Sequence, residues 1–383
     1  MIIYLIVFAL SCFFTALAQR CLKKMQKGEF LTFSIIAIIL PVMLAALRDP
    51  GVGTDSAGYC TSIWSAVLQY RHFDVLMNLF NNDFFPEVER IYLITNWLVS
   101  LFSEDIHTLF FVLNLLVIGF IYKAAYDNRH KAEMWQVMLL FQILFYSNSL
   151  NLIRQYIAVA IGTYAYKFLE KHNWKKLIFW TTIMFMWHST TIVFIALIFI
   201  DLLFNIQNKK AKKLVTAGIC ISMYILYTQF DNILIFTVNQ GIIPSRFTAY
   251  LKQYSDETFF DTSSTLFSVI ILFFYLYLLV YLKNKQNKPE LKKFFIYKSI
   301  ATFLNLTSLI SKFLFRMSYF FSNITDCIFL PRALFMLKQK SKSRYYIFSL
   351  SVVFLSIALW YFLYVKNGIN QTVPYKSSIL GIE

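Results

Sequence analysis

The sequence predicts an all-α, polytopic integral membrane protein that forms a single membrane domain over residues 1–383. Of the 383 residues, 58% are hydrophobic and only 15% are charged, whereas a soluble domain carries about 25% charged residues. The apolar residues fall into blocks of about 17–24 residues separated by lysine clusters, which is the pattern of helices that span a bilayer. We therefore expect about 10–12 transmembrane or re-entrant helices. This pattern excludes a soluble enzyme, a disordered protein and a secreted disulfide scaffold.

The basic residues indicate topology rather than nucleic-acid binding. The formal net charge is +16, but the basic residues sit in short connections between apolar blocks, where the positive-inside rule places cytoplasmic loops. The basic clusters are 20–27, 123–131, 171–176, 209–213, 283–293 and 338–344. If all are cytoplasmic, both termini and the segments between the clusters face outward. These segments are the first outer loop 48–90, the short loop 147–151, the second outer loop 228–264, the turn near 311–316 and the tail after 364.

Three apolar runs determine how many times the chain is expected to cross the membrane. The run 1–18 lacks a basic leader region and a clear cleavage site, so we interpret it as an uncleaved first helix. The run 91–102 is too short to span and is expected to be interfacial or re-entrant, which leaves 106–122 as the crossing. The run 177–200 lies between two clusters that are both predicted to be cytoplasmic. A break near His188–Ser189 would reconcile them, and failure of the charge rule at one loop is the alternative.

Arginine persists in the predicted outer regions, where lysine is depleted. Guanidinium groups bind phosphate and carboxylate through two parallel hydrogen bonds and keep their charge in dry sites. The excess therefore indicates an anion site at the outer face. The alternative is that some of these arginines pair with Asp74, Asp83, Glu87 or Glu89. The outer arginines are Arg48, Arg71, Arg90, Arg154, Arg246 and Arg316.

The first outer loop opens with a compact polar motif. Arg48 is followed by Gly51, Gly53, Thr54 and Asp55, and Tyr59 comes one helical turn later. The glycines and Pro50 allow a tight turn whose backbone N–H groups point at an anion. Asp55 is a candidate to orient a sugar hydroxyl, accept a proton or hold an arginine. The alternative is that Asp55 forms an Asx turn or caps a helix.

Two further motifs lie within apolar segments. Arg154-Gln155 begins the span 152–169, and a charged residue there normally faces protein or water and marks a functional path. His188 lies in the middle of an apolar run and is a candidate hydrogen-bond donor or general base, or a structural hydrogen-bonding residue. Lys298, Asp326 and Arg332 are candidates for an internal ion-pair set. We find no Walker loop, zinc motif or dinucleotide fingerprint, so no metal and no cofactor are expected.

The ordered set of motifs resembles the EpsG family, which is related to the Wzy-type polymerases of bacterial exopolysaccharide, capsule and O-antigen. The resemblance rests on four stretches that span nearly the whole chain. They are Val52-Gly53-Thr54-Asp55 with Tyr59, Ile153-Arg154-Gln155-Tyr156-Ile157-Ala158-Val159-Ala160, Phe185-Met186-Trp187-His188-Ser189-Thr190-Thr191 and Val373-Pro374-Tyr375-Lys376. Two features depart from the family: Trp187 stands where the family usually has Phe, and the region around Arg316 matches only loosely.

The resemblance implies a glycosyltransferase-C/Wzy-like membrane fold and a metal-independent glycosyltransferase. Such an enzyme moves a growing glycan from one polyprenyl diphosphate onto a new lipid-linked repeat unit at the outer face of the bacterial cytoplasmic membrane. The chemistry adds a hypothesis for the mechanism, in which preorganised guanidinium groups stabilise the leaving diphosphate. We assign this role to Arg154 with help from Arg246 or Arg316, and the general base to His188 or Asp55. The other residues expected to contact substrate are Arg48, Gly53, Thr54, Tyr59, Gln155 and Tyr375.

The implied partners are polyprenyl-diphosphate-linked oligosaccharides, membrane lipid and a chain-length regulator, with no nucleic acid. Three other functions compete with polymerisation. An O-antigen-ligase-like transferase would use the same donor with a different acceptor. A flippase for lipid-linked oligosaccharide is disfavoured because the sequence has no internal repeat and its arginines lie toward one face. A membrane-bound acyltransferase is suggested by His188 alone.

Overall fold

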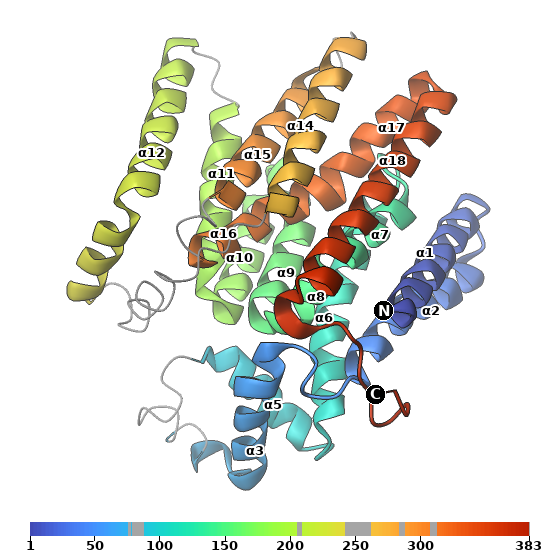
Figure 1. The fold of residues 1–383 in the computed structure, drawn as a ribbon, viewed down its shortest axis with the longest axis vertical. Helices are drawn as coiled ribbons and strands as arrows, with labels where there is room; N and C mark the ends of the chain where they lie inside the picture. The colour runs from blue at the N-terminus through green and yellow to red at the C-terminus, as the bar shows by residue number, and fades with distance from the viewer. Residues whose placement is uncertain are drawn as a thin grey trace. The chain divides into compact units, whose positions relative to one another are not determined.

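The computed structural model is all-helical over the part of the chain that it describes, which comprises residues 1–75, 78, 88–204, 209–241, 262–282, 288–306 and 312–382. Within these ranges the only extended pairing is an isolated bridge between Ser377 and Ile382. The chain divides into two compact units (Figure 1). The first comprises Met1–Ile192 and Asp326–Glu383, and the second comprises Val193–Thr325.

Six helical segments in the described ranges are long and apolar enough to cross a bilayer, which confirms the predicted all-α polytopic membrane protein. Long apolar runs form helices in a bilayer because a helix satisfies its own backbone hydrogen bonds. Shorter apolar helices cover Met134–Leu144 and Ser189–Leu203. The six long segments are Ile2–Lys23, Lys27–Ala46, Ile106–Asp127, Ser263–Tyr281, Phe315–Lys340 and Lys342–Lys366.

The first unit is a bundle of helical hairpins. Helix α1 packs on α2, α2 on α6, α6 on α9, α9 on α10, and α17 on α18. The helices before the second unit are α1 (Ile2–Lys23), α2 (Lys27–Ala46), the short π-helix η1 (Ser56–Cys60), α3 (Thr61–Gln69), α5 (Arg90–Ser100), α6 (Ile106–Asp127), α7 (Met134–Leu144), α8 (Tyr146–Asn151), α9 (Ile153–Glu170), α10 (Trp174–Trp187) and η2 (Ser189–Thr191). After η4 (Asn323–Phe329) come α17 (Leu330–Lys340), α18 (Lys342–Trp360), η5 (Tyr361–Lys366) and η6 (Ile369–Gln371).

The second unit contains a helix that continues where the sequence predicts a loop. Helix α12 runs to Asn239 past a kink at Gln229 (φ −118°, ψ 16°). Residues 228–239 are therefore helical, and residues 242–261 of the expected second outer loop lie outside the described residues. The helices of this unit are α11 (Ile192–Phe204), α12 (Lys209–Asn239), α14 (Thr262–Tyr281), α15 (Lys288–Leu306) and α16 (Lys312–Ser322).

Four basic clusters lie at one end of the first unit, as a common cytoplasmic side would require. The Gln19 side chain donates to the Arg129 carbonyl at 3.2 Å and accepts from the Met134 N–H at 2.9 Å. Lys338 pairs with Glu133 at 2.5 Å. These bonds join the ends of α1, α6 and α17. The end of α9 lies at the same place, because its last residue, Glu170, bonds to Arg332 of α17. The clusters that meet there are 20–27, 123–131, 171–176 and 338–344.

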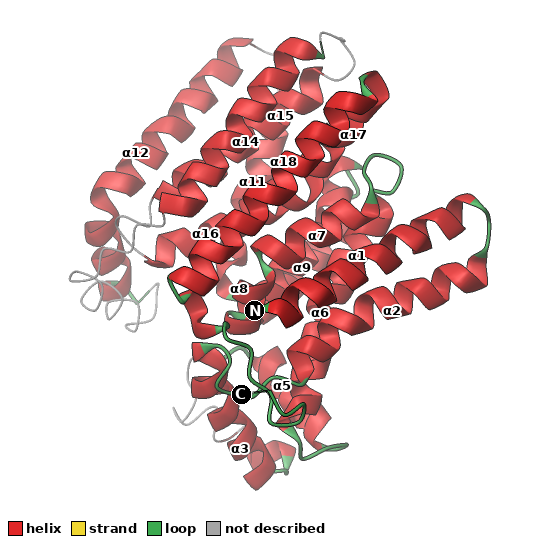
Figure 2. Ribbon diagram, turned by 45° about the vertical axis from the view of Figure 1, so that its right-hand side comes forward, coloured by secondary structure: helices red, strands yellow, loops and turns green. Residues whose placement is uncertain are grey.

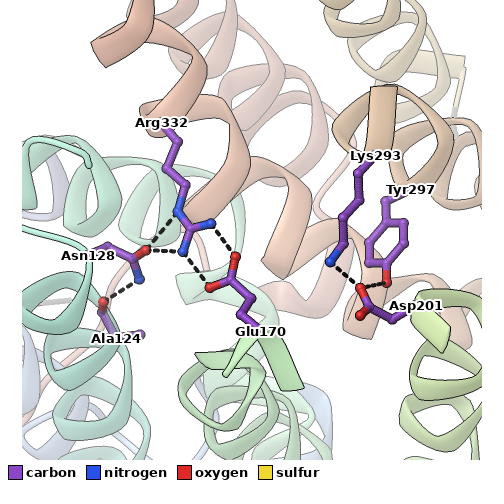
Figure 3. A network of polar contacts seen from close by, with 7 residues as sticks. All are labelled: Ala124, Asn128, Glu170, Asp201, Lys293, Tyr297 and Arg332. Atoms are coloured by element: carbon purple, nitrogen blue, oxygen red, sulfur yellow. Dashed lines mark hydrogen bonds and ion pairs between the residues drawn. The ribbon is translucent and has the colours of Figure 1, made fainter. Parts of the chain in front are cut away.

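Arg332 forms a buried ion pair at this basic end. Its guanidinium donates to both carboxylate oxygens of Glu170, at 2.5 and 2.8 Å, and to Asn128 Oδ1 from Nε at 2.8 Å (Figure 3). The Arg332 side chain is only 3% exposed, so the pair replaces the water that the charge would otherwise need. The second unit contains a separate polar cluster. There the Asp201 carboxylate pairs with Lys293 and accepts a hydrogen bond from the Tyr297 hydroxyl at 2.8 Å.

Of the two alternatives for the run 177–200, the structure shows the break near His188–Ser189. Helix α10 ends at Trp187, His188 is extended (φ −164°, ψ 134°), and the single turn η2 precedes α11. Helix α5 has 11 residues and is not among the helices long enough to span, which agrees with the expectation for 91–102. The opposite end of the first unit from the basic clusters holds the loop after α2, the start of α9 and the C-terminal segment, which lie together near the N and C labels (Figure 2).

Candidate functional site

Arg48 holds the loop that follows α2. Its side chain is fully buried, and it donates to the carbonyl oxygens of Ala45, Val52 (3.2 Å) and Leu150 (3.2 Å). The guanidinium also lies 4.2 Å from the centre of the Phe110 ring. These contacts occupy the fork that an anion would use. The arrangement therefore favours a role for Arg48 in shaping the loop, in place of the diphosphate contact expected from the sequence.

Gly53 is at the tightest point of this loop. Its φ of +101° lies in the region that favours glycine. A Cβ atom at this position would lie 3.3 Å from Ser56 Oγ and 3.4 Å from the Leu150 carbonyl oxygen. The Gly53 N–H also donates to the Gln371 carbonyl at 3.2 Å. The motif therefore needs glycine so that the loop can approach α8 and the C-terminal segment closely.

We expect Gly53→Ala to destabilise the loop by about 1–3 kcal/mol, because the new Cβ would add a contact to a strained backbone. The expected result is a lower Tm in detergent and reduced activity. Gly51→Ala is the matched control, since a Cβ at Gly51 has no heavy atom within 4 Å. Equal melting temperatures for the two variants would contradict this explanation of the motif.

Three asparagines tie the loop to the rest of the site, and sequence reasoning missed them. Asn151 Oδ1 accepts from Thr54 Oγ1 at 3.0 Å and from the Asp55 N–H at 2.8 Å. Asn151 donates to Asn370 at 3.1 Å, and Asn370 donates to Asn148 at 2.7 Å. Asp55 itself is half-buried and makes no capping bond to the helix that follows. The backbone of the Thr54-Asp55 pair is therefore positioned by an amide from another helix.

The C-terminal segment packs against the same loop. The Tyr375 hydroxyl donates to the Leu44 carbonyl at 3.0 Å, and the Asp49 N–H donates to the Lys376 carbonyl at 2.9 Å. Ser378 donates to the Asp49 carboxylate through both its N–H and its hydroxyl, at 2.7 and 2.8 Å. The motif 373–376 thus lies beside the 52–55 motif, although more than 300 residues separate them. These contacts give Tyr375 a structural position in which its hydroxyl is already used.

Arg154 lies in the first turn of α9 inside an aromatic cage. Its guanidinium forms an ion pair with Glu89, and it stands 4.6 Å from the centre of the Tyr59 ring and 5.8 Å from that of Tyr92. The Arg154 and Glu89 side chains are 18% and 16% exposed. Burial raises the pKa of the Tyr59 hydroxyl well above its ordinary value, so this group stays protonated at physiological pH. The site therefore contains the Arg154 cation, which is partly shielded from water, and the protonated phenol of Tyr59 beside it. Gln155, the next residue, is buried.

His188 lies at the same end of the α9–α10 hairpin as Arg154. Helix α10 packs along α9, and η2 contacts α9. The Thr190 N–H donates to His188 Nδ1 at 3.2 Å. A backbone N–H can only donate, so Nδ1 is an acceptor and a neutral ring carries its proton on Nε2.

The expected contributions of Arg246 and Arg316 to this group stay predictions, and Arg71 has a partner of its own. Arg71 pairs with Glu104, and the two side chains are 47% and 75% exposed. Arg316 is half-buried on α16 in the second unit, so its part in the site stays a prediction. Arg246 lies outside the described residues. Among the described residues, no group of three or more His, Cys, Asp or Glu residues is placed to hold a metal ion.

Comparison with known families gives one match that covers nearly the whole chain. A model of the EpsG family matches residues 31–377. These residues contain all four motifs that converge at this end of the first unit. No curated protein and no solved structure matched the chain.

Proposed function

The chain belongs to the EpsG family, a family of Wzy-like polysaccharide polymerases, and on this premise we propose that it polymerises lipid-linked oligosaccharide repeat units. The donor is a glycan on a polyprenyl diphosphate, and the acceptor is a second lipid-linked unit. The reaction takes place at the outer face of the bacterial cytoplasmic membrane and serves the synthesis of exopolysaccharide, capsule or O-antigen. The protein partner that we propose for this role is a chain-length regulator.

One observation carries the proposal: the 52–55 loop, Arg154, His188 and the 373–376 segment converge at one end of the first unit, opposite its basic clusters. They come from four distant parts of the sequence. A site that holds a guanidinium in an aromatic cage at the end of an apolar helix bundle suits a diphosphate on a lipid chain. The apolar helices around it suit the polyprenyl tail.

The transfer is a single displacement at the anomeric carbon. The acceptor hydroxyl oxygen forms the new bond to that carbon, and the bond from the carbon to the diphosphate oxygen breaks. The polyprenyl diphosphate leaves with the bonding electrons, and the hydroxyl proton passes to a base. Arg154 stabilises the charge that builds on the diphosphate, because a preorganised cation in a partly dry site needs little rearrangement. Thr54, Tyr59 and Gln155 line the same region.

We assign the base to Asp55 and a donor role to His188. The Nδ1 of His188 is held by the Thr190 N–H, so the ring has no free lone pair for a proton in this conformation. Its Nε2–H instead donates to a sugar or phosphate oxygen. Asp55 is half-buried near Tyr59, and its backbone is fixed by Asn151.

His188→Asn is expected to keep the fold and lose activity. An asparagine Oδ1 replaces Nδ1 as acceptor for the Thr190 N–H, but no group replaces Nε2–H. We expect a loss of about 10²-fold or more in kcat, with an unchanged Tm. His188→Ala is the comparison, since it removes both functions and should also lower the Tm. Full activity of His188→Asn would show that Nε2 takes no part.

The function is tested by the glycans of cells that lack the gene. Deletion should leave single capped repeat units, and the wild-type gene should restore a ladder of lengths. A ladder that persists while only its attachment to the final acceptor is lost would indicate a ligase. Lipid-linked units that accumulate on the cytoplasmic face would indicate a flippase, and both outcomes would overturn the proposal.

A further inference from the structure

We propose that Glu89 is the positioning residue of Arg154 and that the diphosphate of the donor takes its place on the guanidinium during each turnover. This inference rests on the proposed function. Glu89 is the last residue before α5 and has an extended backbone (φ −63°, ψ 134°). Arg154 belongs to α9, which lies 65 residues further along the chain. The ion pair therefore joins two elements that the sequence does not connect locally.

The surroundings of the pair explain why Arg154 needs an anion before the donor arrives. The guanidinium lies 4.6 Å from the centre of the Tyr59 ring and is mostly shielded from water. An unpaired charge in such a place is costly, so a resident carboxylate stabilises the arginine in its cage. Tyr59 lies against the guanidinium, and Glu89 holds it through Nη1. Arg154 is thereby held ready for an incoming anion.

A carboxylate and a phosphate bind the same edges of a guanidinium. The Glu89 contact is made between Oε2 and Nη1, which is one of the positions that a phosphate oxygen would occupy. The donor must therefore compete with Glu89 for Arg154. The carboxylate returns when the polyprenyl diphosphate departs, which helps to release a product that would otherwise remain on the arginine.

The ion pair at the basic end has the opposite design. Arg332 binds both oxygens of Glu170 together with Asn128 and is only 3% exposed. Arg154 is more exposed than Arg332, at 18% against 3%, although Glu89 is less exposed than Glu170, at 16% against 24%. Three nitrogens of Arg332 are bonded to Glu170 and Asn128, whereas Arg154 meets Glu89 through Nη1 and lies beside Tyr59. Arg154 is therefore the arginine that can exchange its anion.

The test measures binding of a short-chain polyprenyl diphosphate to the purified full-length protein in detergent. We compare wild type, Glu89→Gln, Arg154→Ala and the double variant, each checked for an unchanged Tm. Glu89→Gln should bind the probe about tenfold more tightly, because the competing anion is gone. It should also lower the KM for donor and lower kcat, since product release slows. The double variant should match Arg154→Ala, because Glu89 acts only through that arginine.

Three results would overturn the proposal. Weaker binding of the probe by Glu89→Gln would mean that the carboxylate only stabilises the structure around Arg154 and does not compete with the diphosphate. An unchanged Kd with a lower kcat would mean that Glu89 acts on the acceptor instead. Additive effects in the double variant would mean that Glu89 acts independently of Arg154. In contrast, wild-type binding by Arg154→Ala alone would reject the diphosphate site itself, and with it the proposed function, whatever Glu89 does.

Discussion

Replacing Arg154 with alanine is expected to reduce polymerisation by about 10²–10³-fold. The Arg154 guanidinium lies 4.6 Å from the Tyr59 ring and is partly exposed, whereas Arg48 beside the same motif is fully buried and bonded to backbone carbonyls. Loss of the Arg154 guanidinium removes the cation that stabilises the charge on the leaving diphosphate. Because that charge is greater in the transition state than in the bound donor, kcat should fall more than KM rises. The measurement is the rate of chain extension by protein reconstituted in vesicles.

Two variants make this prediction specific. Arg71→Ala removes an arginine that also pairs with a glutamate, but both partners are exposed, and it should leave the rate unchanged. Arg154→Lys keeps the charge and loses the planar fork, so it should recover only part of the activity. Equal rates for Arg71→Ala and Arg154→Ala would contradict the assignment of Arg154 to the site.

The second large effect is on stability, at the other end of the same unit. Glu170→Ala removes the carboxylate that pairs with the buried Arg332 guanidinium and leaves that charge without its anionic partner Glu170. Breaking a buried pair in this way costs about 3–5 kcal/mol. We therefore expect a large fall in the free energy of unfolding in detergent, together with poor accumulation in cells. The rate per folded molecule should stay near that of wild type, because Glu170 is far along α9 from Arg154.

A double variant distinguishes a lost contact from a buried charge. Arg332→Met with Glu170→Leu removes both charges and keeps similar volume, so it should recover most of the stability. Arg71→Ala is the surface control and should change the free energy of unfolding by about 0–1 kcal/mol. If Glu170→Ala is as stable as wild type, Arg332 does not depend on this carboxylate.

Properties of the fold that depend on local pattern were predictable from the sequence. Blocks of apolar residues mark the helices because the bilayer demands internal hydrogen bonding. A break near His188 was one of two alternatives that the charge on both sides of the run 177–200 left open, and the structure shows the helix broken there. The helix that extends α12 to Asn239 was missed, since its polar residues near the kink at Gln229 resemble those of a loop.

Properties of the site that depend on distant pairing were not predictable. The expectation that arginines mark an anion site stays a prediction, and pattern alone did not separate Arg48, which bonds to backbone carbonyls, from Arg154, which faces a carboxylate. The pairing of Glu89 with Arg154 was one of several alternatives. Asn151 was missed because an amide carries no charge and has no characteristic spacing, and its role emerges only when α8 meets the 52–55 loop.

The most direct measurement uses purified protein in lipid vesicles with a single labelled lipid-linked repeat unit as both donor and acceptor. The account predicts dimers and longer chains, with one polyprenyl diphosphate released for each new glycosidic bond and no nucleotide sugar added. Arg154→Ala should give neither product. Movement of the intact lipid-linked unit across the vesicle membrane, with no new bond and no released diphosphate, would contradict the account and identify a transporter.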